Sequence, residues 1–124
     1  MTGSSAVPEY GVVVLDCPEP TKLAGFYAAL LEWPEPEASE DGEWVTITGP
    51  KGAKIAFQRV EGYRPPEWPG QDAPQQVHLD LYVGDLDAGS GRAVELGAKP
   101  LDSSPETFRV FADPAGHPFC LCHC

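Results

Sequence analysis

The chain has 124 residues, of which 42% are hydrophobic and 22% are charged, and its formal net charge is −11. This length suits one globular domain, and no apolar run approaches the roughly 20 residues that a membrane span needs. Its 8 basic residues are scattered among 19 acidic ones, whereas phosphate backbones are bound by clustered Lys and Arg, so we expect neither nucleic acid nor a membrane as a partner.

Residues 1–9 contain neither the basic stretch nor the apolar stretch of a secretory signal peptide, and we interpret them as a flexible lead-in. A cytoplasmic location, where cysteines stay reduced, is therefore expected. Three of the four cysteines, Cys120, Cys122 and Cys124, alternate at the end of the chain. Their Cys-x-Cys spacing differs from that of structural zinc sites, so free thiols packed on a strand are the favoured interpretation.

The first half of the chain predicts a strand, a helix and a hairpin. Residues 10–17 (YGVVVLDC) form a β-branched run that is typical of a strand and is followed by two prolines. Thr21 is the expected N-cap of a helix that continues to Leu31 with apolar residues at helical spacing. Residues 43–48 and 53–60 predict two strands joined by the turn Gly-Pro-Lys-Gly.

Residues 61–74 connect the two halves and contain four prolines, two glycines, Tyr63 and Trp68 without periodicity. The segment is too long for a tight turn and too aromatic for a disordered linker. We interpret it as an ordered crossover that lies over a cavity mouth or against a partner subunit. Because so apolar a segment is unfavourable in water, a homodimer is predicted.

The second half opens on the most informative stretch of the sequence. Leu79 and Leu81 alternate with His78 and Asp80, and this period of two is typical of a half-buried strand. One face of the strand would carry aliphatic side chains toward the core. The other would carry an imidazole and a carboxylate together.

A helix from Asp87 to Leu96, ended by Gly97, is predicted next. Strands over residues 108–112 and 118–122 follow, joined by the turn Asp-Pro-Ala-Gly. The two halves therefore repeat the same order of elements, and placing Val12 over His78 sets an offset of 66 residues (78 − 12). A duplicated β-α-β-β unit, with room for one more weak strand in each half, describes this α+β pattern.

Three stretches in this order carry a resemblance to a known family: DCPEPTKLAGFYAALLEW, HLDLYVGDLDAG and FADPAGHPFCL. From about Val12 to Cys122 the chain resembles the superfamily of glyoxalases, bleomycin-resistance proteins and ring-cleaving dioxygenases, which share the vicinal oxygen chelate fold. The resemblance implies a single domain over residues 10–124. Two βαβββ modules, at about 10–60 and 75–124, would have sheets that curl around one cavity. It also implies that dimers are common.

Members of this superfamily with metal chemistry place one ligand on the first strand and one on the fourth strand of each module. Register matching assigns these positions to Val12, Ala56, His78 and Cys120. Only His78 is the usual ligand type, so no metal or other cofactor is expected, and any metal ion would be held by His78 and Cys120. Glu32, after the first helix, stands where the family usually has glycine.

Strand alternation and the curled sheets place eight residues on the inner faces of the predicted cavity: Val12, Val14, Ala56, Gln58, His78, Asp80, Cys120 and Cys122. This mixture of small apolar residues and a few polar groups is typical of ligand pockets. We therefore predict a pocket bordered by Gln58, His78 and Asp80. The remaining predicted ligand-binding residues are Trp44, Trp68, Phe108 and Cys120.

Each candidate also has a structural interpretation. His78 would be a hydrogen-bonded cavity histidine, Asp80 a solvated carboxylate, and the aromatic rings part of the core or of a dimer interface. His117, in the last turn, is expected to be structural. Two functions are predicted: a small-molecule-binding protein that sequesters its ligand as bleomycin-resistance proteins do, or a lyase or dioxygenase-type enzyme. The enzyme would use His78 as a catalytic residue with Asp80 or Cys120, with or without a metal.

Overall fold

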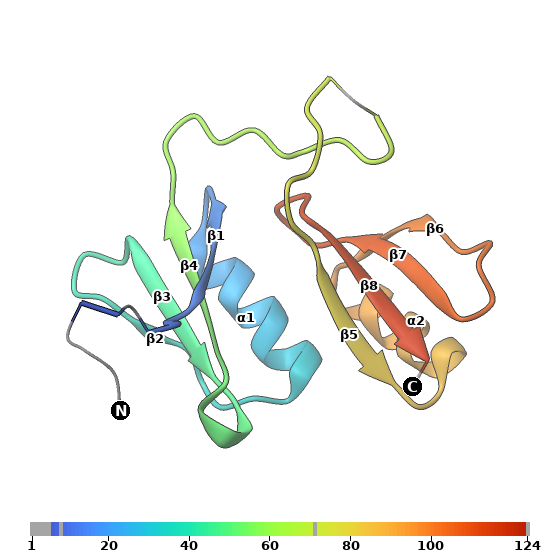
Figure 1. The fold of residues 1–124 in the computed structure, drawn as a ribbon, viewed down its shortest axis with the longest axis horizontal. Helices are drawn as coiled ribbons and strands as arrows, with labels where there is room; N and C mark the ends of the chain where they lie inside the picture. The colour runs from blue at the N-terminus through green and yellow to red at the C-terminus, as the bar shows by residue number, and fades with distance from the viewer. Residues whose placement is uncertain (1–5, 8, 71, 124) are drawn as a thin grey trace.

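The computed structural model describes residues 6–7, 9–70 and 72–123, which form two modules of one helix and one four-stranded sheet each (Figure 1). Part of the predicted lead-in and Cys124 lie outside the described residues. No described helix is long and apolar enough to cross a membrane.

Module 1 contains β1 (Val13–Cys17), α1 (Pro20–Leu31), β2 (Glu37–Ala38), β3 (Trp44–Thr48), the 3₁₀ turn η1 (Pro50–Gly52) and β4 (Lys54–Arg59). Its strands lie in the order β1-β4-β3-β2, with β1 parallel to β4 and the other pairs antiparallel. Module 2 repeats this plan with β5 (Leu79–Val83), α2 (Leu86–Leu96), β6 (Lys99–Asp102), β7 (Phe108–Ala112) and β8 (Pro118–His123) in the order β5-β8-β7-β6. The predicted duplication is confirmed, and β2 and β6 are the additional strands.

The beginning of α1 differs from the prediction. The helix starts at Pro20 rather than after Thr21, and its N-cap is Glu19, which makes no side-chain capping bond. Proline suits this first position because its backbone nitrogen carries no hydrogen that would lack a partner there. The N-cap of α2 shows the usual chemistry instead: the Asp85 carboxylate accepts a hydrogen bond from the Ala88 amide at 3.0 Å.

The helix-facing side chains of both modules form one core. Phe57 of β4 and Phe119 of β8 are fully buried, and Leu15 and Leu121 are nearly so. Tyr27 of α1 lies between the modules, because its ring centroid is 5.8 Å from that of Phe57 and 6.0 Å from that of Phe119. Helix α1 therefore packs against both sheets, and Leu79 and Leu81 of β5 pack against this core as predicted.

Candidate functional site

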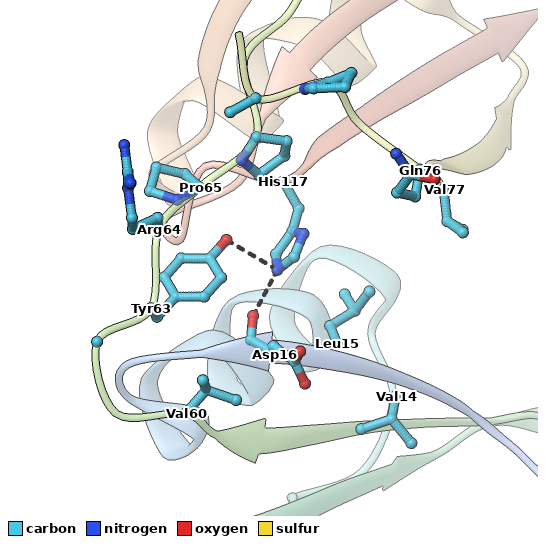
Figure 2. Close-up of a pocket in the computed structure, with 14 residues that line it drawn as sticks. Val14, Leu15, Asp16, Val60, Tyr63, Arg64, Pro65, Gln76, Val77 and His117 are labelled. Carbon is cyan, nitrogen blue, oxygen red and sulfur yellow. Dashed lines mark hydrogen bonds between the residues drawn. The ribbon is translucent and has the colours of Figure 1, made fainter.

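An open hollow of about 520 Å³ lies between β1, the turn before β8 and the crossover that joins the modules (Figure 2). We call it the crossover hollow. Its walls are mainly apolar and include Val14, Leu15, Val60, Pro65, Pro74 and Val77. The polar groups on its lining include Asp16, Tyr63, Arg64, Gln76 and His117. The crossover thus covers a cavity, one of the two positions that its composition suggested.

A buried carboxylate holds the turn before β8, from which His117 reaches the crossover hollow. Asp113, only 4% exposed, accepts a hydrogen bond from the Tyr27 hydroxyl at 2.6 Å. Its other oxygen accepts from the backbone amides of Ala115 and His117 at 2.9 and 3.0 Å. Burial raises the pKa of Asp113, and these hydrogen bonds oppose the rise. Burial also raises the pKa of Tyr27 well above its usual value, so its hydroxyl stays a donor.

The ring of His117 links this turn to module 1. Its Nε2 lies 2.6 Å from the backbone carbonyl oxygen of Asp16 and 3.1 Å from the Tyr63 hydroxyl (Figure 2). Because a carbonyl oxygen only accepts, Nε2 must carry the hydrogen and donate it to Asp16. The Tyr63 hydroxyl donates to the Ala115 carbonyl oxygen at 3.0 Å, and burial raises the pKa of Tyr63 to about 12. The Tyr63 hydroxyl and the His117 Nε2 therefore already have hydrogen-bond partners within the protein.

The predicted pair His78 and Asp80 lies on the mixed face of module 2. The His78 Nε2 is 3.2 Å from an Asp80 carboxylate oxygen, and both side chains are about half exposed. Asp80 is the register partner of Cys120 on β8. One ligand atom from each of these three residues lies within 4.8 Å of the others, and we call them the donor cluster. Burial, followed by the nearby Asp80 charge, raises the pKa of the Cys120 thiol to about 11.

The remaining predicted ligand-binding residues lie elsewhere. Trp44 and Gln58 are register partners on the mixed face of module 1, and Phe108 lies on β7 of module 2. Trp68, in the crossover, lines a second hollow of about 620 Å³ beside Lys99. None of the residues predicted to bind a ligand or catalyse a reaction lines the crossover hollow.

Two of the predicted residues, Gln58 and His78, lie next to residues that line the crossover hollow. Gln58 is the register partner of Asp16, and His78 follows Val77 in the chain.

Sequence reasoning missed Asp16, Tyr63 and the partners of Asp113. The sequence predicts Asp113 only as part of a turn, and Tyr27 only as one of the residues at helical spacing in the first helix. A signal was present in both cases. Aspartate at the start of a turn commonly accepts hydrogen bonds from backbone amides of that turn, and a buried tyrosine hydroxyl usually has a partner.

The four-position metal arrangement that the resemblance implies does not fit the residues of this chain. Val12 and Ala56 occupy the two positions of module 1, and neither side chain has an atom that binds a metal. The donor atoms gathered in the described residues all come from module 2, in the donor cluster. Any ion would therefore be held by one module, with a thiol among its ligands.

Comparisons with known proteins agree with this fold. The profile described as Glyoxalase-like domain matches residues 12–122. One similar solved structure is a glyoxalase/bleomycin resistance protein/dioxygenase family enzyme from Burkholderia phytofirmans, with 14% sequence identity and a TM-score of 0.69 over 90% of this chain and 95% of that one. A second is the antibiotic-binding protein TnmS3 from a Streptomyces species, with 22% identity and a TM-score of 0.58 over 97% of this chain and 98% of that one. A third is the fosfomycin resistance protein FosX from Mesorhizobium loti, with 13% identity and a TM-score of 0.69 over 94% of this chain and 91% of that one. No curated protein matched. The chain belongs to the glyoxalase-like domain family.

Proposed function

We propose that the protein binds a small molecule in the crossover hollow and holds it without chemical change. The observation that carries this proposal is the hollow itself. Its volume of about 520 Å³ lies within the range of roughly 300–1,000 Å³ that is usual for ligand sites. Its mainly apolar walls with a few polar groups also have the composition of such sites.

The chemistry of the lining supports binding rather than catalysis. A nucleophile or general base needs a group that loses its proton near the working pH. Burial keeps Tyr63 protonated, so its hydroxyl is not a base near neutral pH. The antibiotic-binding protein of similar fold supports a role in binding a compound.

A substitution that fills the crossover hollow with a larger side chain tests this proposal. Val77 lines the crossover hollow and is 62% exposed, so Val77→Trp should block the hollow with little strain on the core. Val94→Trp, at a 44% exposed position on α2, is the matched control. A panel of small aromatic and alicyclic molecules would be screened by NMR titration. Binders should lose roughly tenfold or more in affinity, equivalent to about 1.4 kcal/mol, in Val77→Trp only. Equal affinity in both variants would place the ligand elsewhere.

An enzyme is the second candidate, and the donor cluster is the observation that favours it. His78 is a possible acid or base, Asp80 would orient it, and three protein ligands are the number found in catalytic zinc sites. Elemental analysis of the purified protein tests this candidate. Stoichiometric zinc, nickel or iron that is lost in His78→Ala would favour the enzyme, whereas sequestration without a cofactor predicts no such metal.

A further inference from the structure

The geometry of the crossover hollow points to a ligand class: organic cations in which an apolar body carries a protonated amine that pairs with the carboxylate of Asp16. This inference rests on the proposed function, because it names what the hollow binds. The argument depends on where Asp16 lies, on what its neighbours are already bonded to, and on the walls around it.

Strand alternation turns the Asp16 side chain toward open space. Its neighbours Leu15 and Cys17 are buried on the helix side of β1, so Asp16 faces the other way and is exposed. It lines the crossover hollow. Its carboxylate forms no ion pair with any residue in the described part of the chain. A negative charge is thus available at the edge of an apolar hollow.

The backbone of Asp16 is fixed in place. Its carbonyl oxygen accepts the hydrogen bond from the His117 Nε2 at 2.6 Å, which holds β1 against the turn before β8. The His117 backbone amide is held in turn by the buried Asp113 carboxylate. A charged group on a fixed backbone loses less conformational entropy when it pairs with a ligand than one on a mobile loop. Asp16 therefore suits a role in ligand selection.

The other polar groups of the lining do not compete for this role. The Tyr63 hydroxyl and the His117 Nε2 already have partners within the protein. Arg64 is the basic side chain of the lining, and Figure 2 shows its side chain extending away from Asp16 and His117. Asp16 and Arg64 are the charged residues of the lining, and the Asp16 carboxylate is the one that lies by the apolar side chains of Val14 and Val60.

The walls suit the apolar part of such a cation. Val14 and Val60 lie beside Asp16 in Figure 2, and Pro65 and Val77 border the same space. The ring of Tyr63 also lines the hollow, and aromatic rings attract cations that approach within about 6 Å. The net charge of −11 raises the local concentration of cations around the protein.

Three probes of similar size and different charge test the inference on the full chain: 2-phenylethylammonium, 2-phenylethanol and 3-phenylpropanoate. Binding would be followed at low ionic strength through the amide NMR signals of Val14, Tyr63 and Val77. The ammonium probe should bind roughly threefold to fivefold tighter than the alcohol, as expected for an ion pair at an exposed position. Asp16→Asn should remove this preference and leave the alcohol unaffected. Glu95→Gln, with the same change of charge on α2, should keep it.

Three results would overturn the inference: equal binding of ammonium and alcohol to the unaltered protein, a preference that survives Asp16→Asn, or strongest binding of the propanoate with its loss in Arg64→Gln. If the alcohol binds in the hollow and Val77→Trp abolishes its binding, the proposed function stands and only the cation preference fails. If no probe moves these signals, the cation preference is wrong, and the wider panel with Val77→Trp decides the proposed function.

Discussion

Replacing Tyr27 by phenylalanine removes one hydroxyl and leaves the ring in place. Tyr27 is 0% exposed and Asp113 4% exposed, so water cannot easily replace the lost 2.6 Å hydrogen bond. Hydrogen bonds to charged groups contribute about 1.5–3 kcal/mol, and we expect a loss near 2 kcal/mol. Unfolding entropy is about 2.1 cal/mol/K per residue. The 124 residues then give about 260 cal/mol/K, so the Tm should fall by roughly 8 °C.

The loss should also depend on pH. Burial raises the pKa of Asp113 and the Tyr27 hydrogen bond opposes this rise, so the folded pKa should be higher still in Tyr27→Phe. A carboxyl group with a raised folded pKa contributes stability that is present below its unfolded pKa and is lost as the pH rises through its folded pKa. Protonation of Asp113 therefore adds more to the free energy of unfolding of Tyr27→Phe than to that of the unaltered protein. The loss of stability in the variant should be larger near neutral pH than in acid.

Urea unfolding followed by circular dichroism, near neutral pH and at acid pH, measures both effects. Tyr82→Phe is the control, because Tyr82 is 76% exposed on β5 and such surface changes stay within about 0.5 kcal/mol. A loss in Tyr27→Phe no larger than that of the control, or one that is the same at both pH values, would refute this account of Asp113.

Changes at three backbone positions and the state of assembly give further tests. Glu32→Gly should raise the free energy of unfolding by about 0.5–1 kcal/mol, because residue 32 has φ 56° at the end of α1, a conformation that glycine adopts without steric cost. Gly49→Ala should lower it by about 1–3 kcal/mol, because a Cβ there would collide with the Trp33 ring. Gly25→Ala, on α1 with open space around it, should raise it by about 0.5–1 kcal/mol. We propose a homodimer because Trp44, Tyr82 and Phe108 are exposed, and light scattering should give twice the chain mass.

Urea unfolding measures the three backbone changes, and two of them have an outcome that would contradict the stated reason. A less stable Glu32→Gly would mean that the 3.4 Å ion pair between Glu32 and Arg92 contributes more than the strained backbone costs. An unchanged Gly49→Ala would mean that the Trp33 ring moves aside easily. A monomer mass at micromolar protein concentration would contradict the homodimer.

The order of the elements could be predicted because its signals are local. Alternation at Leu79 and Leu81, the helical spacing in 21–31 and the glycine at 97 each act within a few residues, and each element is present in the structure. The pair His78 and Asp80 was predictable for the same reason. Residues two apart on a strand share a face, and their side chains do lie together.

The crossover hollow could not be predicted in the same way. It is built from β1, the crossover and the turn before β8, and its key contacts join residues far apart in sequence. Tyr27 and Asp113 are 86 residues apart, and Asp16 and His117 are 101 apart. Periodicity and turn chemistry indicate that such groups need partners, but not which distant residues the partners are. The aromatic, proline-rich composition of the crossover indicated an ordered segment but not which side chains it would meet.

The turn at residues 113–116, which begins with Asp113, also bears on how the two modules fold and how they could be exchanged. Its counterpart in module 1, residues 49–52, contains no acidic residue, so the duplicated halves are no longer equivalent. A chain built from two copies of module 2 would contain two such turns. Neither would find the tyrosine of α1, and each would bury a carboxylate without its donor. We expect a separated module 2 to be unstable, and the whole chain to lose its structure in one cooperative transition.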